Sequence, residues 1–108
     1  MEPHRRAELR SLAYHRQIAA RLATQPHLLV RARQRVEGWL AAGPAAPAEA
    51  EAWAALLTAD ATAIAVLLTE DSEHARGLRQ SSPFAGALTA AERWRLWRET
   101  RVPVEAER

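Results

Sequence analysis

The residues with most potential for chemistry lie in the segment LRQSSPF, residues 78–84, and in the stretch that follows it. Ser81 and Ser82 offer two adjacent hydroxyl groups that could act as nucleophiles. However, no G-x-S-x-G motif surrounds them, and no histidine lies close in sequence to act as their base. A serine followed by a proline is also ordinary loop chemistry. The pattern therefore does not favour nucleophilic catalysis.

The sequence also contains no clear pattern for a metal site or for acid–base catalysis. The four histidines are His4, His15, His27 and His74. No pair of them has the i, i+4 or H-x-E spacing of a metal site. Glu70 and Asp71 could form an acid–base or metal cluster with His74, but acidic residues at a helix start usually complement the helix dipole. His15 falls on an apolar helix face, where a hydrogen-bonded core histidine is the commoner outcome. Without cysteines or phosphate-binding glycine motifs, we expect no enzyme activity, no cofactor and no small-molecule substrate.

Arginines and tryptophans are concentrated near the end of the chain. The group comprises Arg79, Arg93, Arg95, Arg98 and Arg101, with Trp94 and Trp97 among them. The two tryptophans are spaced i, i+3 and so share a helix face, and mixtures of Trp and Arg are enriched in binding hot spots. The alternative is that both tryptophans belong to the core. The other arginine run, RARQR at residues 31–35, points in different directions around a helix and is typical of a solvated face.

The elements that must position these residues are all helical. Apolar residues recur with helical spacing, and no β segment is evident. Pro3 and Pro26 suit helix starts, Gly43 suits a helix end, Asp60 a cap, and TAAE at 89–92 a capping box. We therefore expect an all-α fold: a single small helical domain of about five helices over residues 1–102, followed by a flexible tail over 103–108.

Helical periodicity also predicts the core. The first helix should run from Pro3 to about Thr24, and the last should end near Arg101. The expected inward stripes contain Tyr14, Ile18 and Leu22; Leu28, Leu29, Ala32, Val36, Trp39 and Leu40; Trp53, Leu56 and Leu57; and Ile64, Leu67 and Leu68.

Composition limits the environment and the partners. The 108 residues carry a net charge of only +2, and all basic residues are arginine. That charge predicts only weak contact with DNA. No stretch has the length of a membrane span, and the chain does not begin with a secretory signal, so we expect a cytoplasmic protein without membrane contact.

The order of segments resembles a group of short bacterial proteins. The stretch LAYHRQIAARLATQPHLLVRARQRVEGWL in the first half and EDSEHARGLRQSSPFAGALTAAERWRLWRE near the end carry the resemblance. These proteins look like the antitoxin halves of toxin–antitoxin gene pairs. The resemblance implies a protein that binds and neutralises a partner toxin, encoded by the adjacent gene.

For such a role the expected partner-binding residues are Arg79, Gln80, Ser81, Ser82, Phe84, Arg95 and Arg98. Arg79 and Gln80 would end a helix with their donors exposed. Phe84 would either enter the domain's own core or project into a pocket of the partner. In the purely structural alternative, Phe84 fills a gap in the fold while Arg79 and Gln80 cap backbone carbonyls.

A second hypothesis is a nucleic-acid-binding transcriptional regulator that uses the arginine-rich last helix. The two hypotheses are compatible, since antitoxins can also bind their own operator. No helix-turn-helix signature is visible in the sequence.

Overall fold

The computed structural model describes the backbone of residues 3–106 and the side chains of residues 5–99. In this part of the chain the fold is all-α, with six α-helices, one short 3-10 helix and no strand. The α-helices are α1 (Pro3–Arg21), α2 (His27–Ala42), α3 (Ala50–Leu56), α4 (Ala61–Thr69), α5 (Glu73–Gln80) and α6 (Ala90–Ala106), and the 3-10 helix is η1 (Gly43–Ala45). The predicted fold class is confirmed, with six α-helices where about five were expected.

Side-chain caps fix the starts of the later helices. The Asp60 carboxylate accepts a backbone N–H of the first turn of α4 at 2.8 Å. Ser72 does the same for α5 at 3.1 Å. Thr89 and Glu92 form the predicted capping box at α6, with reciprocal bonds of 2.9 and 3.1 Å. Each cap satisfies an N–H group that a helix start would otherwise leave without an acceptor.

The helix ends differ from the expected ones by a few residues. Helix α1 ends at Arg21 rather than near Thr24. Gly43 ends α2 as predicted, with a positive φ of 64° that a side chain would resist. Helix α6 continues to Ala106, past the expected end near Arg101. The expected tail, residues 103–108, is thus helical as far as Ala106, and its last two residues lie outside the described part; its flexibility stays a prediction.

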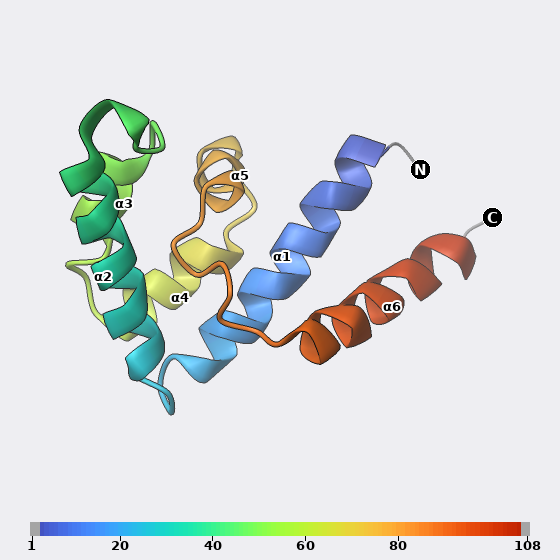
Figure 1. Cartoon of the computed structure of the whole chain (residues 1–108). Helices are drawn as coiled ribbons and strands as arrows, with labels where there is room; N and C mark the ends of the chain where they lie inside the picture. The colour runs from blue at the N-terminus through green and yellow to red at the C-terminus, as the bar shows by residue number, and fades with distance from the viewer. Residues whose placement is uncertain (1–2, 107–108) are drawn as a thin grey trace.

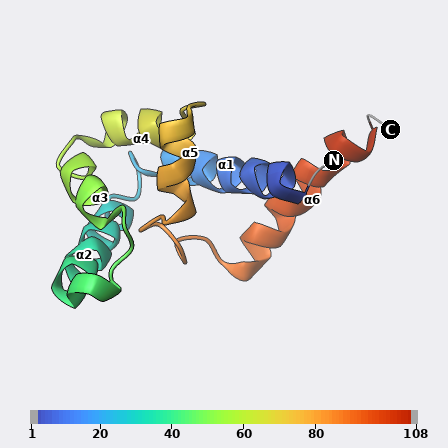
Figure 2. The same ribbon diagram turned by 90° about the horizontal axis from the view of Figure 1, so that it is seen from above.

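Helix α1 is the centre of the arrangement. It packs against α4, α5 and α6, while α2 packs against α3 on the other side of the molecule. Figures 1 and 2 show α6 running beside α1, away from the α2–α3 pair. The segment that joins α5 to α6, residues 81–89, lies between these two sides and is called the α5–α6 loop below.

The core lies where the loop meets the helices. Its largest fully buried side chains include Trp53, Phe84, Ile18 and Leu68. The Trp53 and Phe84 rings meet edge to face with centroids 6.2 Å apart. The Trp53 indole N–H donates to the carbonyl of Leu78 at 3.1 Å, which satisfies the polar end of a buried ring. Burial of one such ring contributes about 2–3 kcal/mol.

Leu40 is an exception among the predicted core residues. It is 46% exposed, so its assignment to the core stripe of α2 is wrong. It lies in the last turn of α2 and lines a shallow hollow that also contains Ala54 and Thr58. The apolar spacing of α2 continues to its last turn, but the helices that pack against α2 do not cover that turn at Leu40.

Candidate functional site

The segment LRQSSPF, residues 78–84, is mostly internal. Arg79 is only 6% exposed and Phe84 only 2%. The Arg79 guanidinium donates from Nη1 to the carbonyls of Leu68 and Glu70 at 3.3 and 2.9 Å. These carbonyls belong to the end of α4, where helix geometry leaves acceptors without N–H partners. The expectation that Arg79 exposes its donors to a partner is therefore wrong, and the capping alternative describes it.

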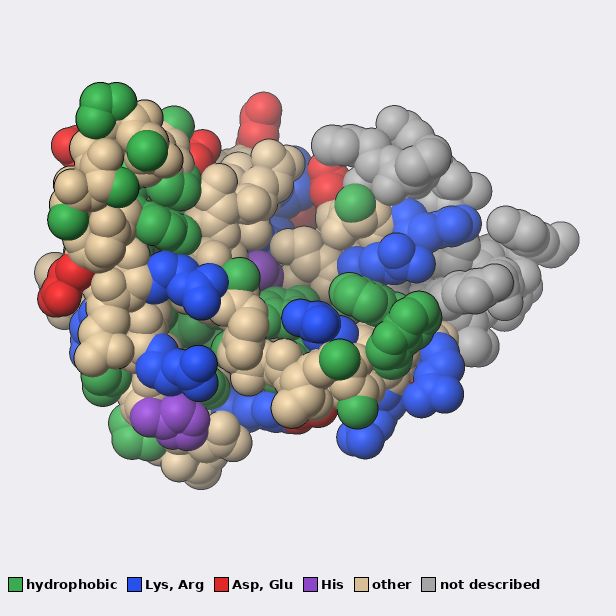
Figure 3. All heavy atoms as spheres, viewed as in Figure 1, with side chains coloured by type: hydrophobic (Ala, Val, Ile, Leu, Met, Phe, Trp, Pro, Cys, Tyr) green, Lys and Arg blue, Asp and Glu red, His purple; other side chains and the backbone are tan. Residues whose placement is uncertain are grey.

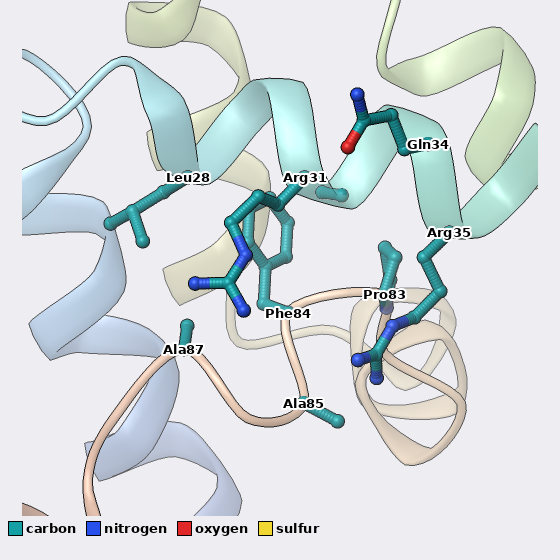
Figure 4. A pocket seen from close by; sticks show the side chains of 9 residues that line it. Leu28, Arg31, Gln34, Arg35, Pro83, Phe84, Ala85 and Ala87 are labelled. Carbon is teal, nitrogen blue, oxygen red and sulfur yellow. The ribbon is translucent and has the colours of Figure 1, made fainter.

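Phe84 fills the fold rather than projecting from it. Figure 4 shows its ring pointing from the α5–α6 loop toward α2, near Leu28 and Arg31. The hollow around it has a volume of about 300 Å³. Of the two alternatives for Phe84, entry into the domain's own core is confirmed.

Ser82 makes a contact that the sequence did not reveal. Its Oγ lies 2.8 Å from Nε2 of His15, although 67 positions separate the two residues. His15 Nδ1 lies 2.7 Å from the Ser11 carbonyl oxygen, which can only accept, so Nδ1 carries the hydrogen. Nε2 therefore accepts the Ser82 hydroxyl hydrogen. Ser82 Oγ in turn accepts the backbone N–H of Phe84 at 3.1 Å.

This pair has the atoms of a nucleophile and its base, but the hydroxyl is used within the fold. His15 is 3% exposed, and the carbonyl of Ser11 stands where a triad has a carboxylate. Both the hydrogen and an acceptor position of the Ser82 hydroxyl are taken by protein groups. The arrangement fastens the α5–α6 loop to α1.

Burial lowers the pKa of His15 from 6.5 to about 4, against the raising effect of the Ser11 carbonyl. The positive charge of Arg79 lowers this pKa further. His15 is thus neutral at physiological pH, in agreement with the tautomer that the two hydrogen bonds require.

Tyr14 holds the other end of the same loop. Its hydroxyl donates to the Phe84 carbonyl at 2.9 Å and accepts the Leu88 N–H at 3.4 Å. Because Tyr14 and His15 are consecutive in α1, one turn of that helix fixes the loop at both ends.

The surface of α6 contains the exposed part of the predicted site. Trp94 is 63% exposed, so the alternative that both tryptophans belong to the core is wrong for this residue. Its ring meets that of the half-buried Trp97 edge to face at 5.8 Å. Arg95 and Arg98 are exposed on the same helix. We call Trp94, Arg95 and Arg98 the α6 face.

A cleft of about 640 Å³ lies between α6, α1, α2 and the α5–α6 loop. Its charged and aromatic lining consists of Arg10, Arg35, Arg79 and Arg93 with Tyr14, Trp39 and Trp97. No described acidic side chain lines it. Figure 3 shows arginine side chains over α2 and over α6 on one face of the molecule, with a hollow between them. We call this feature the arginine cleft; Gln80, Ser81 and Ser82 also line it.

No protein-family profile, curated protein or solved structure matches the chain. Function must therefore be argued from the chain's own residues. Within the described residues, no three His, Asp or Glu side chains lie close enough together to hold a metal ion. In the same part of the chain, no helix is both long and apolar enough to cross a membrane.

The acidic cluster considered at residues 70–74 serves local structure. Glu70 accepts the Ser72 hydroxyl at 2.8 Å, and Asp71 pairs with Arg76 at 2.9 Å. His74 is exposed and makes no described side-chain contact.

Sequence reasoning missed the arginine cleft because four separate segments supply its arginines. Arg10 comes from α1, Arg35 from α2, Arg79 from α5 and Arg93 from α6. Only the clustering of arginines near α6 gave a signal. The Ser82–His15 contact joins residues 67 positions apart, so no residue close to Ser82 in the sequence indicates it.

Proposed function

We propose that this chain is a non-enzymatic protein-binding module of the cytoplasm, the antitoxin of a toxin–antitoxin pair. It binds its toxin through the α6 face and neutralises it by covering or distorting the toxin's active site. The observation that carries this proposal is the exposed Trp94 together with the exposed Arg95 and Arg98 on the same helix. The resemblance of the sequence to antitoxins supports the choice of partner.

An exposed tryptophan of this kind is well suited to a partner pocket. Trp94 leaves most of a large apolar ring in water, and tryptophan is among the residues most enriched in binding hot spots. Its edge-to-face contact with Trp97 limits the positions of the ring before binding. A side chain that is already ordered loses little entropy in a complex.

The charge of the α6 face specifies the partner further. Neither Arg95 nor Arg98 has a carboxylate partner among the described side chains. Guanidinium groups bind carboxylates through two parallel hydrogen bonds. We therefore expect a toxin surface with an apolar hollow for Trp94 and acidic side chains around it. Gln80 and Ser81, at the rim of the arginine cleft, are candidates for polar contacts.

The test is co-expression with the product of the adjacent gene. The variant Trp94→Ser/Arg98→Glu should weaken the complex by at least about a hundredfold, because it removes a hot-spot ring and sets like charges against each other. It should then fail to co-purify with the toxin or to protect cells from it. Val66→Ser is the matched control, since Val66 is 61% exposed and lies on α4.

Thermal melting of each purified variant verifies the fold. A double variant that melts like the parent and still protects cells would contradict the proposal. Sequence-specific binding of duplex DNA by the chain alone at physiological salt would instead favour the transcriptional-regulator hypothesis.

A further inference from the structure

We propose that the arginine cleft is a binding site for a nucleotide, with its phosphate held by arginines and its base against the aromatic wall. The proposal does not depend on the toxin-binding function, because the arginines and aromatic rings that it uses are not part of the α6 face and can be studied in the chain alone; only Gln80 and Ser81, which line the cleft, are also candidates for toxin contacts. It rests on the charge, the unpaired donors, the aromatic lining and the size of the cleft.

The arginines of the cleft are not neutralised by the protein. Arg10, Arg35 and Arg93 have no carboxylate partner among the described side chains. Arg79 donates to the carbonyls at the end of α4 from Nη1 only. Guanidinium groups that line one hollow carry charges of the same sign, and an anion bound among them offsets that charge.

Arg93 provides the most specific observation. Its Nε is buried and has no hydrogen-bond partner. A buried donor without an acceptor is costly, and such groups are rare in folded proteins. Because Arg93 lines the cleft, we infer that a bound anion supplies the missing acceptor once this side chain turns toward it.

Of the other arginines, Arg10 is held by an aromatic ring, whereas Arg35 is exposed and lines the cleft from α2. The Arg10 guanidinium lies over the Trp97 ring, 5.6 Å from its centroid, which fixes it between α1 and α6. Figure 4 shows Arg35 reaching from α2 toward the α5–α6 loop. A Cβ on Gly86 would lie 3.9 Å from the Arg35 Nη2. Donors that are already positioned bind an anion with little loss of entropy.

The charge of the cleft favours phosphate over a single carboxylate. Four arginines from four segments surround the hollow, and a phosphate monoester offers two negative charges and three terminal oxygens, whereas a carboxylate offers one charge and two oxygens. Guanidinium groups match the geometry of phosphate oxygens.

The walls favour a flat ring beside the phosphate. Trp39, Trp97 and Tyr14 line the cleft together with the arginines. Nucleobases stack on aromatic side chains and on guanidinium planes. A volume of about 640 Å³ is in the range of clefts that hold ligands of this size. A free nucleotide and the phosphorylated end of a single strand of nucleic acid both present this phosphate and base, so the same contacts would recognise either.

Calorimetric titration of the purified chain with AMP tests the site. Adenosine, which lacks the phosphate, and inorganic phosphate, which lacks the ring, are the partial ligands. AMP should bind at least tenfold more tightly than either, because it makes both kinds of contact. Arg93→Gln and Arg35→Gln should each weaken AMP binding by at least tenfold, whereas Arg16→Gln, an exposed arginine of α1 outside the cleft, should leave it unchanged.

A second titration distinguishes a free nucleotide from the end of a nucleic acid as the ligand. It compares a short single-stranded RNA that has a 5′-phosphate with the same RNA carrying a 5′-hydroxyl. Binding of AMP assigns the site to free nucleotides. Binding of the 5′-phosphorylated RNA alone assigns it to a nucleic-acid end. The proposal is overturned if neither ligand binds at millimolar concentration, or if the folded Arg93→Gln and Arg35→Gln variants bind like the parent. Circular dichroism confirms that the variants are folded.

Discussion

Acid should destabilise this domain through His15 before its carboxylates become protonated. In the folded chain the imidazole is neutral down to about pH 4, whereas in the unfolded chain it takes up a proton near pH 6.5. Between these values the unfolded state binds more protons, so the free energy of unfolding falls as the pH falls. The stability that depends on neutral His15 is complete above about pH 6.5 and is lost toward pH 4.

The size of the effect follows from the two pKa values. The interval from 6.5 to about 4 corresponds to about 3 kcal/mol, at roughly 1.4 kcal/mol for each pH unit. A change from about pH 7.5 to about pH 4.5 should remove about 2–3 kcal/mol, because His15 is then still largely neutral in the fold. For a domain whose stability is about 5–15 kcal/mol, that loss is large.

Glu92 acts in a separate and more acidic range. A hydrogen bond from Arg21, together with the N–H of Thr89, lowers the pKa of Glu92 from 4.5 to about 2. Its contribution to stability is therefore present above about pH 4.5 and is lost only below it. A loss of stability measured above pH 4.5 therefore reports on His15 and not on Glu92.

Urea unfolding followed by circular dichroism measures the effect at both pH values. His15→Leu should be less stable than the parent at neutral pH but should lose little further stability on acidification. His27→Gln, which removes an exposed imidazole and leaves His15 in place, should keep the pH dependence that His15 causes. If His15→Leu proves too unstable, an NMR titration of the parent provides the answer, since the His15 ring signals should titrate near pH 4. Titration near pH 6.5, or equal pH dependence in the parent and His15→Leu, would refute the reasoning.

Three further substitutions test the supports of the loop and its neighbours. Arg79→Ala should lower the free energy of unfolding, measured in urea, by about 2–3 kcal/mol, because it leaves buried carbonyls of α4 without a charged donor. The control Arg98→Glu should change it by less than about 0.5 kcal/mol. Equal effects of the two substitutions would show that Arg79 is not needed to cap the end of α4. Gly86→Ala should lower the free energy of unfolding by about 1–2 kcal/mol, since Gly86 has a φ of 84°, which a side chain disfavours. An unchanged melting temperature would show that this backbone conformation does not require glycine. Thr89→Ala should lower the free energy of unfolding by about 1 kcal/mol, because α6 loses its cap. Amide hydrogen exchange in the first turn of α6 should become faster. Unaltered exchange would mean that Glu92 alone is enough to stabilise this helix start.

Local features of the fold could be predicted from the sequence because local chemistry produces them. The Asp60 cap, the Gly43 stop and the Thr89–Glu92 box each depend on residues within one turn. The inward faces of α1 and α4 followed helical spacing, as the burial of Ile18 and Leu68 shows. Periodicity is a reliable guide where a helix is packed along its length.

The candidate site could be predicted only in part, because packing decides it. Whether Arg79 faces solvent or caps α4 depends on how α4 and α5 meet, and no local pattern contains that information. The arginine cleft likewise exists only after α2 and α6 come to lie on either side of the α5–α6 loop. By contrast, the exposure of Arg95 and Arg98 was anticipated, since the polar positions of α6 are fixed by helical spacing alone.

The central position of α1 has a consequence for synthesis of the chain. This helix is translated before its neighbours α4, α5 and α6. The roughly 75 residues from Leu22 to Leu96 take about 4–15 s to translate at about 5–20 residues per second. Until α4 has been made, Ile18 and Leu22 lack the helix that packs most closely against them, and Tyr14 and His15 have no α5–α6 loop to bind. The nascent chain is therefore most exposed to chaperones and proteases before α4 emerges, and a message truncated before α4 would yield α1 without any of the three helices that bury it.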